Sequence, residues 1–403
     1  MLAQRMSSFS TSGTAKARVA AKAAAAAGRQ IIDLSAGEIW CDPPEALRAG
    51  AIAAIERGIN RYTDTIGIDK LREAIAERLS TVTAKSWQAD EVAVTAGGKQ
   101  ALFNAAMAIL NPGDEVIIPA PYWSTFPAQV QLAGATPVFV ETRANGYVPL
   151  IKDIRAAVTP ATRAIIVNTP GNPTGAVFGR ALLGGITELA IRRNLWIIFD
   201  ECYGSFAYPP ARHENIVSTL PQVRSRTLLV GSFSKSLALT GWRLGYLAGP
   251  AEVIAAARAL QSHTTSNPNV IAQYAVLAHL KNDGGRFEQT LRARLSEART
   301  RGLDILSRLA QVPRPLAQGG FYFYLDLSAL LANKLQRGTF ADADDIVRLL
   351  IERAGVAAVS GTAFGDPAGI RLSYGVPLEA LERGLSAVVD ALNHMSAGQR
   401  SAA

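Results

Sequence analysis

One short stretch of the sequence places a lysine among small hydroxyl residues, after an apolar run that predicts a buried strand. The run Thr227 to Val230 precedes Ser232-Phe233-Ser234-Lys235-Ser236, and Arg243 follows the lysine by eight positions. Because these surroundings are apolar and small, we expect the ammonium of Lys235 to be partly desolvated. Desolvation lowers the pKa of a lysine and exposes the free amine that Schiff-base chemistry needs. The serines and Arg243 could hold a phosphate beside that amine, although a solvated surface lysine remains the alternative at this point.

Two glycine-containing turns could present further groups to a ligand. Gly97-Gly98 joins a predicted strand to a predicted helix, so backbone N–H groups at the helix start could cradle a phosphate; the turn could also be ordinary loop geometry. The segment Asn168-Thr169-Pro170-Gly171-Asn172-Pro173-Thr174-Gly175 is more specific. Its prolines and glycines predict a rigid loop at a strand end, from which Asn172 can donate a hydrogen bond.

Three other side chains have types and positions that suit an aromatic ring, and a fourth suits a carboxylate. Asp200 ends an apolar strand, where a carboxylate is costly unless it meets a cation such as a protonated ring nitrogen. Tyr203 could donate to a phenolic oxygen on the same ring. Trp123 offers a flat face for stacking, with a core tryptophan as an equal alternative. Arg371 follows Gly369-Ile370 in an apolar strand piece, and its fork of donors suits a carboxylate unless it forms a surface salt bridge.

Composition and charge narrow the functional class. The chain has 403 residues and a formal net charge of +8, but its Lys and Arg are scattered and form no run of five or six. A mildly basic enzyme that takes anionic ligands is therefore favoured over a nucleic-acid partner. Cys41 and Cys202 cannot build a disulfide framework, which favours the cytoplasm. No apolar run approaches a membrane span, so no membrane partner is expected. No metal is expected, because metal-ligand spacing is missing among His213, His263, His279 and His394.

Strand-like and helical segments alternate from Glu91 to Ala248, which predicts an α/β fold. Continuous apolar strands separated by helices indicate a mostly parallel sheet covered by helices on both faces. Ligands of such sheets bind at the carboxyl ends of the strands, and most candidates named above fall there. The predicted strands are Glu91–Thr95, Glu115–Pro119, Thr136–Val140, Ala164–Asn168, Leu195–Asp200, Thr227–Ser232 and Leu244–Ala248. The predicted helices include Asp69–Leu79, Lys99–Leu110, Trp123–Ala133 and Arg180–Arg193.

The pattern changes beyond Asn282 and predicts a smaller α+β domain. A long helix, Phe287–Ala310, precedes an aromatic strand that ends at Leu325. Strand-like pieces Val356–Val359 and Ile370–Ser373 then alternate with helices Asp342–Ala354 and Leu378–His394. Near the start, Ala15 to Gly28 is interpreted as a helix ending at a glycine rather than as part of a transit peptide. The expected division is an N-terminal segment 1–45 packing with the small domain, a large cofactor-binding domain 46–285, and a small C-terminal domain 286–403.

Together, a phosphate cradle, a carboxylate for a ring nitrogen, a stacking aromatic and a reactive lysine describe a site for pyridoxal 5'-phosphate. From Gly37 to the C-terminal helix, the chain resembles a class I/II aminotransferase of the pyridoxal-phosphate fold-type-I superfamily. Its run Gly97-Gly98-Lys99-Gln100-Ala101-Leu102-Phe103-Asn104 is similar to the bacterial aspartate aminotransferase subgroup. The resemblance implies ping-pong transfer of an amino group from an L-amino acid, aspartate-like or of broad specificity, to a 2-oxo acid such as 2-oxoglutarate.

The resemblance also implies a role for each candidate residue. Lys235 would carry the cofactor and act as general base and acid, while Asp200 would hold the pyridine nitrogen. Cofactor contacts would come from Tyr203, Asn172, Trp123, Ser232, Arg243, Gly97, Gly98 and Lys99. Substrate contacts would come from Arg371, Asn172, Trp123, Gly37 and, for a distal carboxylate, Lys99. Tyr62 would reach a phosphate in the partner subunit, which implies a homodimer with shared active sites.

Three positions depart from the family pattern, and other functions stay open. Ile39-Trp40-Cys41 stands where Pro-Asp-Phe is usual, so we expect a changed substrate entrance. Gly171 replaces an asparagine without touching Asn172, and Ser262 stands near the place of an arginine that binds the distal carboxylate in other subgroups. A carbon–sulfur lyase or another elimination enzyme on the same fold would use the same cofactor residues. A transcription regulator would need a DNA-binding domain, which about 35 residues before the core cannot supply.

Overall fold

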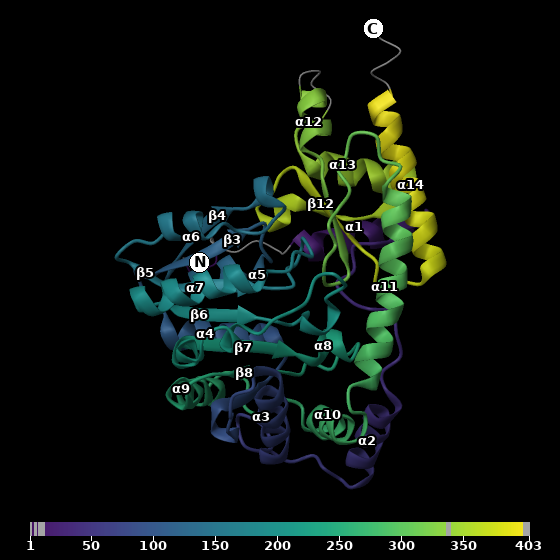
Figure 1. The fold of residues 1–403 in the computed structure, drawn as a ribbon. Helices are drawn as coiled ribbons and strands as arrows, with labels where there is room; N and C mark the ends of the chain where they lie inside the picture. The colour runs from purple at the N-terminus through teal and green to yellow at the C-terminus, as the bar shows by residue number, and fades with distance from the viewer. Residues whose placement is uncertain (1, 4–5, 7–12, 336–339, 398–403) are drawn as a thin grey trace.

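A large sheet crosses the middle of the molecule and is covered by helices on both faces (Figure 1). The computed structural model describes residues 2–3, 6, 13–335 and 340–397. Within them the sheet has seven strands in the order β2-β8-β7-β6-β5-β3-β4. β8 runs antiparallel to both of its neighbours, whereas the other pairs are parallel. The strands are β2 Val92–Thr95, β3 Glu115–Ala120, β4 Thr136–Glu141, β5 Thr162–Asn168, β6 Trp196–Asp200, β7 Thr227–Ser232 and β8 Gly245–Ala248.

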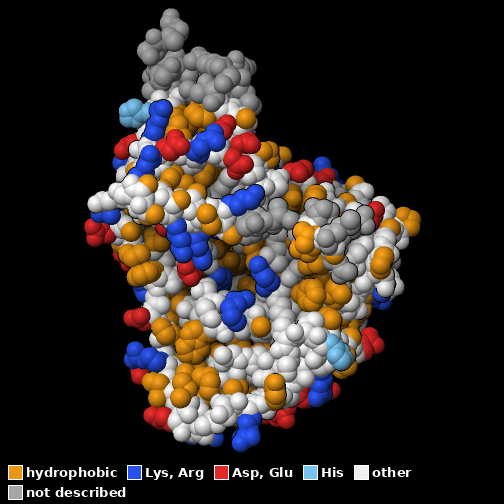
Figure 2. Space-filling view, turned by 180° about the vertical axis from the view of Figure 1, so that it is seen from behind, with side chains coloured by type: hydrophobic (Ala, Val, Ile, Leu, Met, Phe, Trp, Pro, Cys, Tyr) orange, Lys and Arg blue, Asp and Glu red, His pale blue; other side chains and the backbone are white. Residues whose placement is uncertain are grey.

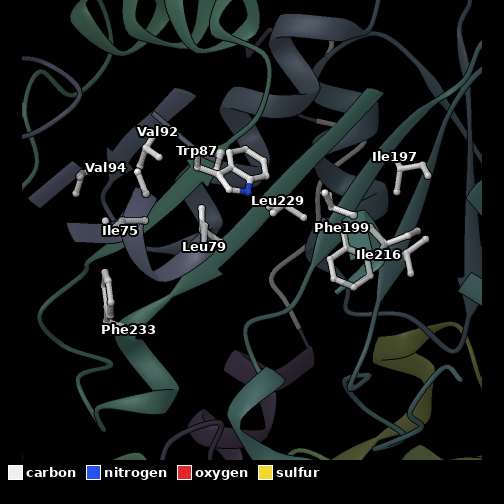
Figure 3. Close-up of a cluster of buried hydrophobic side chains, with 14 of the residues drawn as sticks. Ile75, Leu79, Trp87, Val92, Val94, Ile197, Phe199, Ile216, Leu229 and Phe233 are labelled. Carbon is white, nitrogen blue, oxygen red and sulfur yellow. The ribbon is translucent and has the colours of Figure 1, made fainter. Parts of the chain in front are cut away.

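Alternate residues of the central strands enter two different hydrophobic clusters. Phe199 and Leu229 pack on one face, and Ile198 and Val230 pack on the other. Because successive side chains of a strand point to opposite faces, burial of both faces requires an unbroken apolar run, which is the pattern seen in the sequence. Figure 3 shows the first cluster, with Trp87 beside Leu79 and Leu229. This packing fixes the strand ends from which the site is built.

The helices divide between the two faces of the sheet. The first cluster receives side chains from α2 Glu45–Glu56, α3 Asp69–Thr83, α6 Ile151–Ala156, α7 Arg180–Arg193 and α10 Val270–Asn282. The second receives them from α4 Gly98–Ile109, α5 Thr125–Leu132 and α9 Ala251–Ser262. α7 ends because Asn194 adopts a left-handed conformation, which asparagine tolerates better than most residues. The predicted α/β class, with a mostly parallel sheet, is confirmed.

A smaller antiparallel sheet lies beside the large one, in the order β11-β12-β9. Its strands are β9 Tyr322–Asp326, β11 Val359–Ser360 and β12 Gly369–Ser373. The predicted strand Val356–Val359 was wrong as one element: β10 Val356–Ala357 pairs in parallel with β1 Ile32–Asp33, whereas β11 pairs with β12. Around them lie α1 Gly13–Ala26, α11 Arg286–Leu306, α12 Ser328–Leu335, α13 Ala343–Leu349 and α14 Leu378–Ala397.

Contacts join the N-terminal segment to the small sheet and the small sheet to the large one. Ala17 and Ala21 of α1 are buried in clusters that contain Val359 and Ala357, respectively. The sequence predicted one helix, Asp342–Ala354. In the structure, α13 ends at Leu349 and a π-helical turn, Leu350–Ala354, follows it directly. Arg143, after β4, forms ion pairs with acidic side chains of the small domain, namely Asp326 and Asp366. The exact domain boundaries stay predictions. Among the described helices, none is both long and apolar enough to cross a bilayer.

Candidate functional site

A cavity of about 560 Å³ opens where β5, β6 and β7 end, at Asn168, Asp200 and Ser232. These parallel strands deliver their last residues to one edge of the sheet, as the sequence predicted. The small domain contributes the opposite wall through Tyr322 and Arg371. Figure 2 shows a hollowed face in which several Lys and Arg side chains gather. The other described lining residues are Thr14, Arg18, Gly37, Glu38, Gly98, Lys99, Trp123, Asn172, Cys202, Tyr203, Ser234, Lys235, Thr240, Gly241 and Arg243.

Lys235 is held by a short helix that follows β7. In α8 Phe233–Ser236, the Ser232 side chain caps the helix by accepting a hydrogen bond from the Ser234 N–H, at 3.2 Å. The buried ring of Phe233 anchors this turn in the core, and the amine of Lys235 donates to the carbonyl oxygen of Gly37. Burial lowers the pKa of Lys235 to about 8. About a tenth of the amine is therefore uncharged at pH 7, far more than for an ordinary lysine, and this free amine is what a nucleophile or general base requires.

Asp200 is almost fully buried, at 2% exposure, and has no cationic partner among the described residues. Its carboxylate accepts a hydrogen bond from the Cys202 N–H at 3.0 Å. Burial raises the pKa of Asp200 to about 6, against the smaller opposing effect of hydrogen bonding from Cys202. A protonated ring nitrogen would relieve this cost by supplying the missing cation. Beside it, the hydroxyl of Tyr203 lies 3.3 Å from that of Tyr322.

The glycine turn and Arg243 form a cradle with no room for larger side chains. Gly97 has a φ of +82°, and a Cβ there would lie 2.7 Å from a terminal nitrogen of Arg243. A Cβ on Gly98 would lie 3.0 Å from the sulfur of Cys202. The Arg243 guanidinium donates to the backbone oxygens of Thr240 at 3.0 Å and Ala96 at 3.3 Å, and no described acidic side chain pairs with it. Its charge is thus left for an anion at the N-terminus of α4.

Arg371 lies on β12 with only 1% of its surface exposed, which rules out a surface salt bridge. It donates to the side-chain oxygen of Asn172 at 2.9 Å and to the carbonyl oxygen of Ser35 at 3.0 Å. Its guanidinium carbon lies 4.2 Å from the centre of the Tyr322 ring and 5.1 Å from that of Phe364. Its Nε has no hydrogen-bond partner, and no acidic side chain within the described residues pairs with it. This buried cation suits a carboxylate ligand.

The side chain of Asn172 makes one contact that the sequence did not predict. Its oxygen accepts a hydrogen bond from Arg371, whereas the predicted donation comes from the other end of the amide. Its backbone N–H donates to the side chain of Asn168 at 2.9 Å, which fixes the loop at the end of β5. The Asn172 side chain therefore connects the large sheet to the small domain, and donation by its amide nitrogen stays a prediction.

Trp123 and Lys99 lie on the side of the cavity formed by α4 and α5. Trp123 is half-buried and lines the cavity, so its placement in a closed core is excluded. The Lys99 ammonium lies 5.1 Å from the centre of the Trp123 ring. Burial, with the charge of Arg243 as a second cause, lowers the pKa of Lys99. Lys99 also borders a second cavity of about 870 Å³ between α1, α5 and α13, so it lies at the junction of two open spaces.

Several predicted positions lie away from this cavity. Tyr62 is 88% exposed and does not line it within one chain. Ser262 is exposed at the end of α9, where its hydroxyl donates to the Ala259 carbonyl oxygen at 2.7 Å. The prediction that Trp40 and Cys41 reshape the entrance is not supported by the described lining: Trp40 borders a separate hollow beside α11, and Cys41 accepts a hydrogen bond from Arg294 at 3.2 Å.

Sequence reasoning missed Arg18, Glu38 and Cys202, which also line the cavity. Arg18 belongs to an alanine-rich helix with no motif, and Glu38 lies between Gly37 and the Ile39-Trp40-Cys41 loop without a signal of its own. For Cys202 the sequence offered one signal, because it follows by two residues Asp200, which ends β6.

A group of three titratable side chains lies outside the cavity, and the sequence did not identify it as a group. His279, Asp283 and Glu288 bring their ligand-type atoms within 4.8 Å of one another. Arg78 already pairs with Glu288 at 3.1 Å. Burial alone would raise the pKa of Glu288, but hydrogen bonding to His279 and the charge of Arg78 outweigh it and lower this pKa. We interpret the group as a charge cluster that joins α3, α10 and α11.

Comparison with known proteins gives one consistent result. The family described as aminotransferase class I and II matches residues 29–388. The probable aspartate/prephenate aminotransferase of Aquifex aeolicus is 37% identical, over 98% of this chain and 99% of the relative. The aspartate aminotransferase of Geobacillus stearothermophilus is 36% identical, over 94% and 96%. The structure of Thermus thermophilus aspartate aminotransferase with maleate has a TM-score of 0.90 and 36% identity, over 97% of this chain and 100% of that one.

Proposed function

The chain belongs to the class I and II aminotransferases, a family that uses pyridoxal phosphate, and we propose that its preferred substrates are acidic. Aspartate or a similar L-amino acid would be the amino donor, and a 2-oxo acid such as 2-oxoglutarate the acceptor. The observation that carries this proposal is the charge of the cavity. Its described lining holds the cations Arg18, Lys99, Lys235, Arg243 and Arg371 but only the acids Glu38 and Asp200.

The residues present fit pyridoxal phosphate. Arg243 and the backbone at Gly98 offer an anion site that extra side chains would fill, Lys235 offers an amine, and Asp200 offers a buried carboxylate without a cation. These three groups match the phosphate, the aldehyde and the ring nitrogen of the cofactor. When bound, the cofactor supplies an electron-withdrawing ring that weakens the bond between the substrate's Cα and its hydrogen.

The chain's own residues would then orient the substrate and move its proton. Arg371 binds the α-carboxylate through its fork, and Asn172 fixes the guanidinium by accepting one of its hydrogen bonds. With the cofactor bound, Lys235 would take the proton from Cα and return it at the cofactor's C4′ carbon, which a pKa of about 8 permits near neutral pH. Asp200 would hold the protonated ring nitrogen. Trp123 forms a flat wall against which the ring can stack.

Lys99 is the proposed partner of the substrate's distal carboxylate. It lines the cavity, its described surroundings provide no acidic partner, and Ser262 lies elsewhere with no charge to offer. Relatives named as aspartate or aspartate/prephenate aminotransferases agree with a substrate that carries two carboxylates. An ammonium acts as a point charge, so discrimination against neutral amino acids should be looser than a paired arginine would give.

We also propose a cytoplasmic homodimer in which Tyr62 completes the partner's phosphate site. Tyr62 is 88% exposed and does not line the cavity described above, so contact with a second copy is the simplest explanation of its position.

The test uses the protein loaded with pyridoxal phosphate and a panel of amino donors with 2-oxoglutarate. We expect aspartate to give oxaloacetate and glutamate, and Lys235→Ala to lose turnover by several orders of magnitude. Lys99→Met should raise KM for aspartate at least about tenfold, roughly 1.4 kcal/mol, with little change for alanine. Lys152→Met, on exposed α6, is the matched control.

One result would contradict the proposed reaction, and another would contradict only the proposed role of Lys99. Release of pyruvate and ammonia without an oxo-acid acceptor would indicate elimination rather than transamination. Equal losses in Lys99→Met on aspartate and alanine would remove the distal role of Lys99 while leaving the reaction itself in place.

A further inference from the structure

We propose that Arg18 is a second cation for the distal carboxylate of the substrate, held in reserve by Glu38 until an acidic ligand binds. This inference rests on the proposed function and goes beyond it, because Arg18 belongs to the N-terminal helix and not to any motif of the cofactor site. Arg18 and Lys99 line the same cavity, and one Arg18 nitrogen lies 3.7 Å from a Glu38 carboxylate oxygen.

Helix α1 presents Arg18 to the cavity by its register. Thr14 and Arg18 are four residues apart, so they lie on one face of the helix, and both line the cavity. Ala17 and Ala21 are buried, at 8% and 6% exposure, and fix α1 against the small domain. The small alanines allow close packing there, and the long side chain of Arg18 extends from a fixed helix rather than from a loop.

None of the ligand groups considered so far needs Arg18, because other cations of the cavity are matched to them. Arg243 faces the cofactor phosphate, Lys235 the aldehyde and Arg371 the α-carboxylate. The two remaining cations in the described lining, Lys99 and Arg18, are available to a second carboxylate. A neutral amino acid would leave both unused.

The contact with Glu38 is weak enough to be exchanged for a ligand. At 3.7 Å it is longer than a hydrogen bond, and the side chains are 54% and 53% exposed. Pairs of this kind contribute about 0–1 kcal/mol. Glu38 keeps another partner, because its second oxygen accepts from the Thr240 hydroxyl at 3.0 Å. Transfer of Arg18 from Glu38 to a substrate carboxylate therefore costs little and gains a charge-assisted, forked contact.

The two cations differ in what they contribute. Lys99, next to the Trp123 ring, attracts a carboxylate as a point charge. Arg18 can hold both carboxylate oxygens at once and so fix their direction. We therefore expect Arg18 to raise selectivity for dicarboxylic substrates over neutral ones without affecting chemistry at Cα.

The experiment measures kcat/KM of the pyridoxal-phosphate-loaded enzyme for aspartate, glutamate and alanine, and the Kd of maleate. Arg18→Gln should lower kcat/KM for both acids and weaken maleate binding about tenfold, with alanine changed less than twofold. Arg18→Lys should lie between Arg18→Gln and wild type. Arg29→Gln is the matched control, since Arg29 lies just after α1 and bonds the Glu352 carbonyl oxygen instead.

A double-mutant cycle tests the reserve contact itself. Glu38→Gln should tighten maleate binding in the wild-type background, and most of that gain should vanish when Arg18→Gln is also present. Unchanged acid kinetics in Arg18→Gln, or equal losses on acids and alanine, would overturn the role of Arg18 while leaving the proposed function intact. A wild-type enzyme that accepts no acidic substrate would overturn both.

Discussion

Replacing Arg371 with leucine should weaken carboxylate binding by several orders of magnitude while changing the stability of the ligand-free protein little. The guanidinium is 1% exposed, and within the described chain it faces no acidic side chain. Its fixed contacts are neutral: the side-chain oxygen of Asn172, the carbonyl oxygen of Ser35 and two aromatic rings. A buried cation in this setting obtains its counter-charge only from a ligand.

The magnitudes of the two effects differ for a physical reason. A hydrogen bond to a charged group contributes about 1.5–3 kcal/mol, so loss of a forked pair to the α-carboxylate should cost about 3–6 kcal/mol, or about 10²–10⁴ in kcat/KM. In the ligand-free protein, removal of the charge relieves a desolvation cost of several kcal/mol. It also leaves the oxygens of Asn172 and Ser35 unpaired, at about 1–3 kcal/mol each. These terms oppose each other, so the free energy of unfolding should change by less than about 2 kcal/mol.

The assay combines steady-state kinetics with thermal unfolding in the absence and presence of maleate. Arg371→Leu should lose kcat/KM for aspartate and alanine to the same extent, because the α-carboxylate is common to both, and maleate should no longer raise its melting temperature. Arg371→Lys keeps the charge but not the fork and should lose about 10–100-fold. Arg301→Leu, at an exposed position on α11, is the control. A loss restricted to acidic substrates, or a maleate shift retained in Arg371→Leu, would refute the assignment.

Three further predictions concern the cofactor site and the dimer. In the cofactor-free protein, the rate at which added pyridoxal phosphate reacts with Lys235 should rise about tenfold per pH unit below about pH 8 and level off above it. Only the free amine reacts, and the pKa of Lys235 is about 8. A rate that does not change between pH 6 and pH 9 would contradict this prediction. Asp200→Asn should stabilise the cofactor-free protein above pH 6 by at most about 3 kcal/mol, as measured by urea unfolding. The reason is that burial raises the pKa of Asp200 from 3.8 to about 6, so ionisation of its carboxyl costs stability as pH rises through that interval. The gain should therefore fade between pH 6 and pH 4, and a gain that persists at pH 4 would contradict this origin. Mixing inactive Lys235→Ala with weakened Tyr62→Ala subunits should raise activity if active sites are shared, and a fully active monomer would remove the idea.

Much of the fold could be predicted because burial on two faces leaves a clear trace in the sequence. The runs at Ile197–Phe199 and Leu228–Val230 are apolar at every position, since each face of the sheet has its own hydrophobic cluster. Strand direction leaves no such trace, which is why the antiparallel course of β8 could not be foreseen. The Val356–Val359 piece was misjudged for a related reason: its residues pair with two different strands, and pairing depends on distant segments.

The site could be predicted where local sequence sets the geometry. Asp200 and Lys235 follow buried strands, so the end of each strand fixes its place. Asn172 was identified, but its role as acceptor could not be, because Arg371 comes from another domain 199 residues away. Arg18 was missed for the same reason: its function depends on where α1 packs, and an alanine-rich helix with scattered basic residues gives no sign of that.

The charges of the cavity connect these observations. Asp200 and Arg371 are both buried without a described counter-ion, and burial lowers the pKa of Lys235, so the ligand-free protein bears the electrostatic cost of groups that cofactor and substrate would neutralise. Such costs persist because the surrounding core is large enough to sustain them: two hydrophobic clusters pack on opposite faces of the sheet whose strand ends carry the site. Arg18 differs from the buried groups in being exposed and already paired. Its loss should therefore alter selectivity, whereas loss of Arg371 should remove activity on every amino acid.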